Sequence, residues 1–215
     1  MKTINNYQRT ANYLVKIFKA INAEYFNNSL DMPTITIQST VGAYGHVTTS
    51  KVWTKDNGEA SYELNMGADY LTRPIENVVA TMIHEASHLY ALQNGIRDHS
   101  QVYHNSRFRA IAEGMGHLQV EKHDKYGWTI TSPTEDTLNF IIAHGFEDIH
   151  IGRNTGWTPV STGGDASNNG TPARPPRKPS STRKYQCPCC GNSFGATKDI
   201  RVLCMDCDVQ FEKVS

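Results

Sequence analysis

The stretch His84-Glu85-Ala86-Ser87-His88 decides which fold we assign to this chain. Residues four apart lie on one face of an α-helix, so His84 and His88 can direct two imidazole nitrogens at the same metal ion. Glu85 then lies beside the ion, where its carboxylate is poorly placed to be a ligand but can accept a proton from water. The pattern therefore predicts a Zn²⁺ site with the chemistry of a hydrolase.

The helix that carries this pattern has clear limits in the sequence. Pro74 is typical of a helix start, and Gly95 is typical of a helix end. Between them, apolar residues recur at helical spacing beside the face of the two histidines. One face should therefore pack in the core while the neighbouring face carries the metal chemistry. The apolar stripe consists of Ile75, Val78, Val79, Met82, Ile83 and Leu89.

The segment before this helix predicts one more long helix and a sheet. Residues 7–26 have apolar positions at helical spacing, and the polar residues that follow predict a stop. These positions are Leu14, Ile17, Phe18, Ile21 and Tyr25. Segments 34–38, 44–53 and 60–66 are rich in β-forming residues and are separated by turn residues. We expect them to form a small, mostly antiparallel sheet.

The segment after the metal-binding helix predicts shorter elements. A short helix surrounds Phe108 and ends near Gly114, and residues 126–130 have the composition of a strand. Ser132-Pro133-Thr134-Glu135 fits a capping box with proline at the first helical position. The helix that it opens should end at Gly145, because glycine is the usual residue just past a helix.

Composition limits the organisation and the partners of the chain. Its 215 residues, 38% of them hydrophobic, suffice for one core and a small additional module. Lysine plus arginine balance aspartate plus glutamate at 21 each, so no overall charge attracts the molecule to nucleic acid or to an acidic membrane. We find neither a signal-peptide pattern nor a membrane-spanning apolar run, which predicts a cytoplasmic protein without a membrane partner.

A change of composition divides the chain into three parts. Residues 1–151 form the predicted main domain, and residues 185–215 form a small module. Residues 152–184, rich in Gly, Pro, Ser, Thr and Asn, are predicted to be a flexible linker. This linker carries a basic cluster, which fits either a solvated tether or a nucleic-acid-binding arm that holds phosphates. The cluster consists of Arg174, Arg177, Lys178, Arg183 and Lys184.

The cysteines predict a second metal site in the small module. Cys187 and Cys190 form one C-x-x-C pair, and Cys204 and Cys207 form another. Two such pairs at this spacing are typical of a zinc ribbon. Four thiolates complete the coordination of Zn²⁺, so this site should be structural and should fold the module when metal binds. Cys189 is left over as a free thiol or an alternative ligand.

The sequence pattern alone leaves the third ligand of the first site open. A catalytic zinc keeps three protein ligands. A metzincin would have glycine at Ala91 and histidine at Asn94, so that pattern is excluded. The remaining candidates are His99, His104, Glu113 and His117.

With these motifs in place, the chain resembles the SprT-like family of zinc metallopeptidases. The resemblance rests on the segment Asn22-Ala23-Glu24-Tyr25-Phe26, on the H-E-x-x-H helix, on Tyr103-His104-Asn105-Ser106-Arg107-Phe108 and on the zinc ribbon. It implies an α+β fold with a zincin-like metallopeptidase core. It also implies that His104, on the next helix, is the third zinc ligand, although Asn105 replaces the glycine usual in the family.

The resemblance implies a zinc-dependent metallopeptidase with one catalytic and one structural Zn²⁺. His84, His88 and His104 would hold the catalytic ion, and Glu85 would be the general base. The substrates would be proteins, including proteins bound or crosslinked to DNA, with the ribbon and the basic linker contacting the DNA. The alternative is a nucleic-acid-binding zinc-ribbon protein whose H-E-x-x-H site is structural or inactive.

Several polar residues near these motifs receive weaker assignments. Tyr103 is a candidate hydrogen-bond donor to the oxyanion that forms when water attacks a peptide carbonyl. Tyr44 and His46 are either packing residues or part of an edge strand that holds an extended peptide. Other histidines are interpreted as surface or capping residues. These are His99, His117, His123, His144 and His150.

Overall fold

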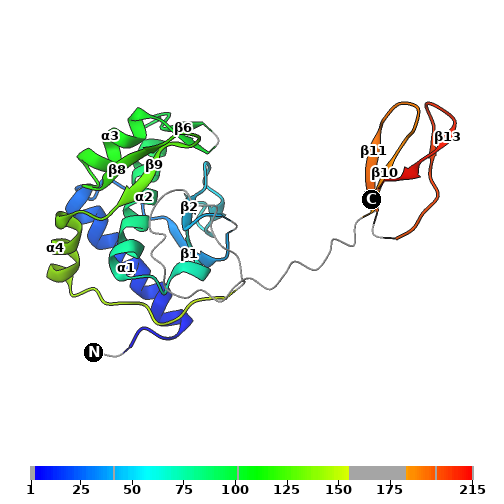
Figure 1. The fold of residues 1–215 in the computed structure, drawn as a ribbon. Helices are drawn as coiled ribbons and strands as arrows, with labels where there is room; N and C mark the ends of the chain where they lie inside the picture. The colour runs from blue at the N-terminus through cyan, green and yellow to red at the C-terminus, as the bar shows by residue number, and fades with distance from the viewer. Residues whose placement is uncertain (1–2, 41, 101, 155–182, 197, 215) are drawn as a thin grey trace. The chain divides into compact units, whose positions relative to one another are not determined.

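A computed structural model describes residues 3–40, 42–100, 102–154, 183–196 and 198–214 of the chain (Figure 1). The chain divides into two compact units, residues 1–168 and 169–215. The first unit is α+β, as predicted. Its helical elements are α1 (Tyr7–Tyr25), the short 3-10 helix η1 (Ala68–Tyr70), α2 (Ile75–Gln93), α3 (Ser106–Gly114) and α4 (Glu135–His144).

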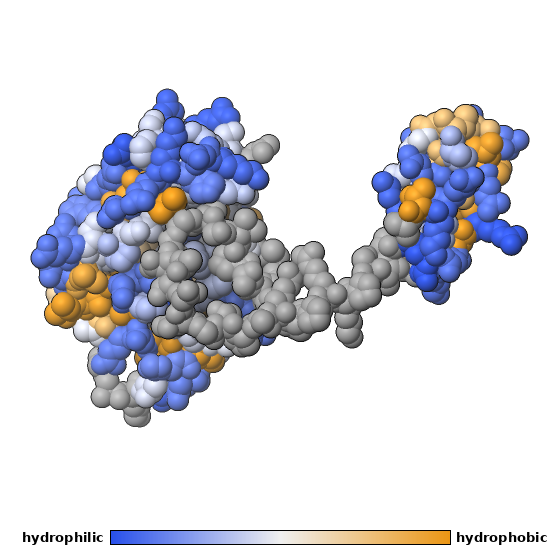
Figure 2. Space-filling model, in the orientation of Figure 1, coloured by the Kyte–Doolittle hydropathy of each residue, from blue (hydrophilic) through white to orange (hydrophobic). Residues whose placement is uncertain are grey.

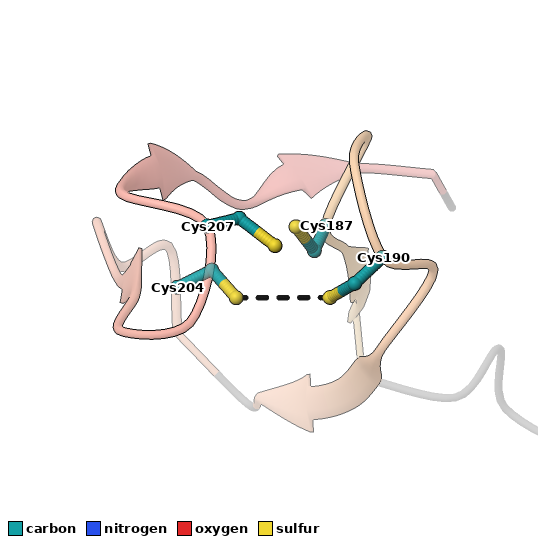
Figure 3. Close-up of side chains that lie close together, drawn as sticks. All are labelled: Cys187, Cys190, Cys204 and Cys207. Atoms are coloured by element: carbon teal, nitrogen blue, oxygen red, sulfur yellow. Dashed lines mark hydrogen bonds between the residues drawn. The ribbon is translucent and has the colours of Figure 1, made fainter.

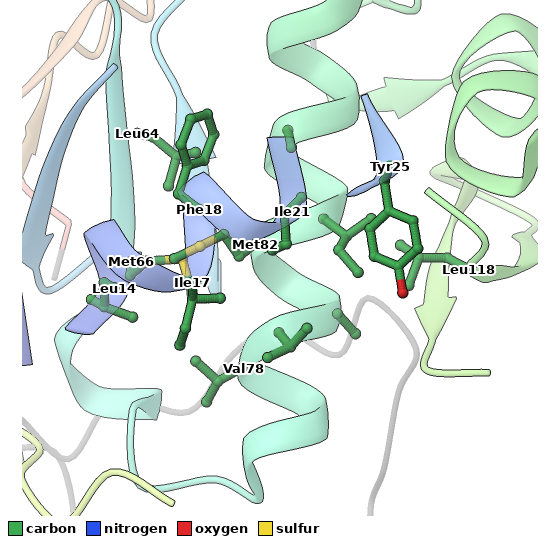
Figure 4. Packing of buried hydrophobic residues seen from close by; sticks show 14 of the residues in the cluster. Leu14, Ile17, Phe18, Ile21, Tyr25, Leu64, Met66, Val78, Met82 and Leu118 are labelled. Carbon is green, nitrogen blue, oxygen red and sulfur yellow. The ribbon is translucent and has the colours of Figure 1, made fainter. Parts of the chain in front are cut away.

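Helix α1 is the predicted N-terminal helix, and it packs against α2. The Asn6 side chain caps it by accepting a hydrogen bond from the backbone N–H of Arg9 at 3.0 Å. The helix ends where Asn27 and Asn28 adopt positive φ angles of 51° and 57°. All five predicted apolar positions of this helix are buried. Figure 4 shows their side chains meeting residues of β5 and α2 in the core.

Helix α2 is the central element of the first unit and carries the H-E-x-x-H motif. It contacts α1, α3, α4, β2 and β9 (Figure 1). Its first backbone N–H, at Ile75, donates to the Asp148 side chain at 2.8 Å. Gly95, with φ of 65°, follows its C-cap Asn94. The predicted apolar stripe of this helix is fully buried, so the prediction is confirmed.

The first sheet has the strand order β1 (Thr34–Gln38), β5 (Glu63–Gly67), β2 (Gly45–Val47). Strand β2 pairs with β5 antiparallel, but β1 pairs with β5 parallel. The prediction of a mostly antiparallel sheet is therefore wrong for one of these two pairings. The long connection between β1 and β5 makes the parallel pairing possible, because parallel neighbours need a crossover. This connection also contains the hairpin of β3 (Trp53–Thr54) and β4 (Ala60–Ser61).

A second sheet was only partly predicted. Its order is β6 (His99–Ser100), β7 (Tyr103–His104), β9 (Gly127–Ser132), β8 (Gln119–His123). Only β9 corresponds to a predicted strand. The two-residue strands β6 and β7 are too short for periodicity to reveal them. His104 lies on β7 rather than on the following helix, which corrects the expectation from the resemblance.

Helix α4 begins two residues later than the sequence suggested. Thr134, not Ser132, is its N-cap, and the capping box joins Thr134 to Thr137. Pro133 consequently precedes the cap instead of being the first helical residue. The helix ends at Gly145, as predicted. Hydrophobic residues gather on the surface over α4 (Figure 2), where Leu138 and Ile142 are exposed while Phe140 and Ile141 are buried.

The second unit consists of short strands. They are β10 (Arg183–Gln186), β11 (Ser193–Ala196), β12 (Leu203–Cys204), β13 (Val209–Gln210) and β14 (Glu212–Lys213). Arg183 and Lys184 belong to β10, whereas Arg174, Arg177 and Lys178 lie outside the described residues. Among the helices that the structure describes, none has both the length and the apolar character that a bilayer crossing requires.

Candidate metal centres

Three imidazoles meet at one point of the first unit. His84 and His88 lie one turn apart on α2, and β7 supplies His104. The Nε2 atom of His88 lies 3.2 Å from that of His84 and 3.0 Å from that of His104. Of the four candidates for a third ligand, the structure thus brings His104 to the pair on α2.

The opposite ring nitrogen of each histidine has its own partner. His88 Nδ1 lies 2.5 Å from Asp98 Oδ2, His84 Nδ1 lies 3.1 Å from Thr131 Oγ1, and His104 Nδ1 lies 3.3 Å from the Val102 carbonyl. Such partners fix the ring orientation and the tautomer of metal-binding histidines. The three Nε2 atoms therefore face one another, while hydrogen-bond partners hold the three Nδ1 atoms on the outer side of the cluster.

These partners show that the site fits a cation. The Val102 carbonyl and the Asp98 carboxylate can only accept hydrogen bonds, so Nδ1 of both His104 and His88 carries the proton. Their Nε2 atoms then present lone pairs to each other at 3.0 Å, with no hydrogen between them. A cation bound by these two lone pairs, with His84 Nε2 as a third ligand, would remove this repulsion. Three neutral imidazoles are a ligand set that suits Zn²⁺ with one open position.

The Phe108 ring packs against all three imidazoles. Its ring centroid lies 4.6 Å from those of His84 and His88 and 4.7 Å from that of His104. The side chain is fully buried at the start of α3, where the Asn105 side chain caps the helix by accepting from Arg107 N at 2.7 Å. Phe108 thus packs in the core directly against the three histidines.

Burial keeps these histidines neutral. It lowers the pKa of His84 well below its ordinary value, and the neighbouring His88 and His104 add to this effect. Burial and the nearby His88 lower the pKa of His104 to about 4. Burial also lowers the pKa of His88, although the Asp98 carboxylate opposes the shift. Neutral imidazole is the form that binds a metal ion.

Glu85 is buried between α2 and the edge strand β2. A Cβ atom on Gly45 would lie 3.2 Å from both Cγ and Oε1 of Glu85, so the strand backbone passes directly over the carboxyl group. Burial and the charge of Asp98 raise the pKa of Glu85 to about 8, while a backbone hydrogen bond from Val47 lowers it. A carboxyl group with a raised pKa suits the exchange of protons near neutral pH.

Sequence reasoning missed the role of Asp98 and misassigned His99. The Asp98 carboxylate is buried between two histidines, and its oxygens lie 2.5 Å from His88 Nδ1 and 2.5 Å from His99 Nδ1. Burial alone would raise the pKa of Asp98, but the hydrogen bonds from both histidines outweigh it and hold the pKa below its ordinary value. His99 is therefore not a simple surface residue.

The other candidate ligands have partners elsewhere. Glu113 accepts hydrogen bonds from Arg109 Nε at 2.9 Å, and His117 pairs with Asp136 at 2.9 Å. Tyr103 neighbours His104 on a strand, so its side chain points to the opposite sheet face and packs near Gly127. This placement does not support Tyr103 as a donor to the oxyanion.

Tyr44 and His46 both belong to the region of the edge strand. The Arg73 guanidinium lies 3.9 Å from the centroid of the Tyr44 ring, which also contacts Tyr70. His46 is on β2, where its Nδ1 lies 3.4 Å from Thr40 Oγ1. Tyr44 thus packs beside β2, as one of the two readings of the sequence expected.

The sequence matches the model of the SprT-like family over residues 14–133. This chain belongs to the SprT-like family. The matched segment includes the three clustered histidines, Glu85 and Asp98. No curated protein and no solved structure matches the chain.

The second candidate centre of this SprT-like protein lies outside the matched segment. Cys187 and Cys190 follow β10, Cys204 ends β12 and Cys207 lies in the turn before β13, and their Sγ atoms point toward one another (Figure 3). All four Sγ atoms lie within 4.8 Å of one another. Cys189 is exposed and is not part of this group. Four converging thiols are the donor set of a closed, structural Zn²⁺ site.

Proposed function

We propose that this protein is a zinc-dependent metallopeptidase that hydrolyses peptide bonds in proteins. The observation that carries the proposal is the convergence of three imidazole Nε2 atoms, with separations of 3.0 Å and 3.2 Å, beside the buried Glu85. A purely structural zinc site has no use for a carboxyl group placed to exchange protons. Membership of the SprT-like family supports the same function.

In this proposal His84, His88 and His104 hold a catalytic Zn²⁺. When bound, Zn²⁺ supplies Lewis-acid chemistry, because it acidifies water and polarises a peptide carbonyl. Glu85 accepts the proton of the attacking water on its carboxylate and later delivers a proton to the departing amine. Thr131, Asp98 and the Val102 carbonyl keep the imidazoles in one orientation throughout. The four clustered cysteines, Cys187, Cys190, Cys204 and Cys207, hold a second, structural Zn²⁺.

The surroundings of Glu85 favour an extended protein segment as the substrate. Strand β2 is at the edge of its sheet, and it lies against α2 directly beside Glu85. An edge strand can pair with an extended chain through backbone hydrogen bonds, which accept almost any side chains. The enzyme should therefore select its substrates by their accessibility and not by a strict sequence.

The proposal includes proteins bound or crosslinked to DNA as a class of substrate. The basic residues at positions 174–184 and the ribbon would bind the DNA and so raise the local concentration of protein substrate. A cleft with little sequence specificity would damage other proteins unless a second binding event restricted it. DNA should therefore stimulate cleavage, and the stimulation should fall with salt concentration.

A gel assay of purified, zinc-loaded protein tests the function. We expect it to cleave a DNA-binding protein or itself, with stimulation by single-stranded DNA, and we expect Glu85→Gln to bind the same amount of zinc without turnover. Glu121→Gln, at an exposed position of β8, is the matched control and should remain active. Unchanged turnover in Glu85→Gln would remove Glu85 from the proposed role.

The same assay separates the proposal from the alternative. Replacing Arg174, Arg177 and Lys178 together by serine should abolish stimulation by DNA and leave the basal rate. Absence of cleavage under every condition, with two zinc ions bound and DNA retained, would instead identify a nucleic-acid-binding zinc-ribbon protein with an inactive site.

A further inference from the structure

A buried carboxylate outside the three proposed ligands connects the site to a fourth histidine. Asp98 is 2% exposed. Its Oδ2 lies 2.5 Å from His88 Nδ1 and its Oδ1 lies 2.5 Å from His99 Nδ1. A carboxylate this deeply buried is costly unless it is paired and hydrogen-bonded. Both oxygens of Asp98 form hydrogen bonds with histidine side chains. These two histidines therefore fix the position of the carboxylate.

His88, Asp98 and His99 also have the spacing of a separate metal site, since their ligand atoms lie within 4.8 Å of one another. The orientation of His88 argues against this reading. Its Nε2 faces His84 and His104 at 3.2 Å and 3.0 Å, and only its Nδ1 faces Asp98. A second ion would break both hydrogen bonds of Asp98, whereas the hydrogen-bonded arrangement pairs both Asp98 oxygens with the Nδ1 atoms of His88 and His99.

We propose that Asp98 is a positioning residue that sets the zinc affinity of the site through His88, with His99 holding its second oxygen in place. This inference rests on the proposed zinc site. An anionic acceptor on Nδ1 fixes the His88 tautomer, orients Nε2 toward the ion and makes Nε2 a stronger donor. His99 restrains rotation of the carboxylate, because its Nδ1 is hydrogen-bonded to Oδ1, the oxygen that does not face His88.

The other two histidines lack such a partner. Thr131 Oγ1 lies 3.1 Å from His84 Nδ1, and the Val102 carbonyl lies 3.3 Å from His104 Nδ1. Both partners are neutral and both contacts are longer than the contact of Asp98. Charge-assisted hydrogen bonds are shorter and about twice as strong as neutral ones. His88 is therefore the ligand whose donor strength depends most on its outer partner.

Hydrogen bonds other than those of its carboxylate hold the loop of Asp98. The Asp98 backbone carbonyl accepts from Asn105 N at 3.0 Å, and Asn105 Nδ2 donates to the Arg97 carbonyl at 2.8 Å. These contacts join the two ends of the segment between α2 and α3 without the carboxylate. An isosteric change at Asp98 should consequently leave the loop in place and alter the metal site alone.

The test compares the full-length protein with Asp98→Asn and Asp98→Ala. Zinc affinity is measured by competition with a chromophoric chelator, and the geometry of the site is followed by the visible spectrum of the Co²⁺ form. His88→Ala identifies which zinc belongs to this site and which belongs to the ribbon. The matched control is Asp136→Asn, which alters another Asp–His pair, the exposed contact with His117 at 2.9 Å.

We expect Asp98→Asn to bind zinc about 10- to 100-fold more weakly and to shift the Co²⁺ spectrum. Asp98→Ala should lose at least as much affinity, His99→Phe should lose less, and Asp136→Asn should match the wild type. Folded Asp98 variants with wild-type affinity and spectrum would overturn the inference, even if their melting temperatures fell. Equal zinc content in wild type and His88→Ala would instead overturn the proposed site itself.

Discussion

At the scale of single residues, two glycines allow the backbone to approach the functional side chains. Gly45 lets β2 pass over Glu85, because a Cβ there would lie 3.0 Å from the Asn65 carbonyl and 3.2 Å from Glu85. Gly127 has φ of 70° and pairs with His104 across β7 and β9. A Cβ on Gly127 would overlap the His104 carbonyl oxygen. The position of the His104 imidazole thus depends on glycine, which has no Cβ, at position 127.

Gly127→Ala should therefore destabilise the protein and displace His104. The positive φ alone costs about 1 to 2 kcal/mol for an L-residue. The overlap with backbone cannot be relieved by a rotamer change, so we expect a total loss of about 3 kcal/mol or more. Thermal unfolding and zinc content of the purified variant measure the two effects.

Gly58→Ala provides the matched control for this prediction. Gly58 also has a positive φ, 83°, but no atom lies within 4 Å of a Cβ built there. This variant should lose only the cost of the backbone conformation and should keep its zinc. Equal losses in the two variants would mean that the close approach to His104 does not matter.

At the scale of elements, helix α4 shows how a local cap is chosen. Ser132 and Thr134 both have side chains that can cap a helix. The structure uses Thr134, whose Oγ1 accepts from Thr137 N at 3.4 Å and donates to the His117 carbonyl at 2.6 Å. Ser132 is instead the last residue of β9, where it pairs with Gln119. The second sheet therefore decides where the helix begins.

Thr134→Ala should lower the free energy of unfolding by about 1 to 2 kcal/mol, because it removes the cap and the hydrogen bond to His117. Thr134→Ser, which keeps the hydroxyl group, should lose much less. Denaturant unfolding of these variants and of Ser132→Ala measures the differences. A loss in Ser132→Ala as large as that in Thr134→Ala would restore Ser132 as the cap.

At the scale of the whole molecule, the two units depend on different forces. The first unit has a core of large buried side chains from α1, α2 and β5 (Figure 4), to which α4 adds Phe140 and Ile141. In the described part of the second unit, the buried residues are Tyr185, Cys187 and Cys204. So small a core cannot offset the entropy of ordering the chain. Structural zinc in small domains supplies about 10 to 16 kcal/mol of binding free energy.

Removal of zinc by a chelator should consequently unfold the second unit and leave the first unit folded. Hydrogen exchange measured on the intact chain should show lost protection at residues 183–214 and retained protection along α1 and α2. Cys204→Ser should behave like the chelated protein, whereas Cys189→Ser should keep its metal. Protection of the second unit after complete zinc removal would contradict this account.

The sequence by itself determined the long elements and the metal chemistry. Helices α1 and α2 follow from apolar positions at helical spacing, which depends only on the geometry of one helix. His84 and His88 share a face for the same reason. The cysteine pairs follow from ligand spacing within short loops. Each of these features depends on residues close together in the sequence, so contacts between distant segments are not needed to predict it.

The tertiary structure decided the parts that join distant segments. The parallel pairing of β1 with β5, the short strands β6 and β7, and the hydrogen bonds of Asp98 depend on which segments meet in space. His104 could be selected over His99 and His117 by a resemblance, but the spacing of these residues does not distinguish them. Only the folded chain brings His104 to 3.0 Å from His88, because Gly127 lets β7 pair with β9, which contacts α2.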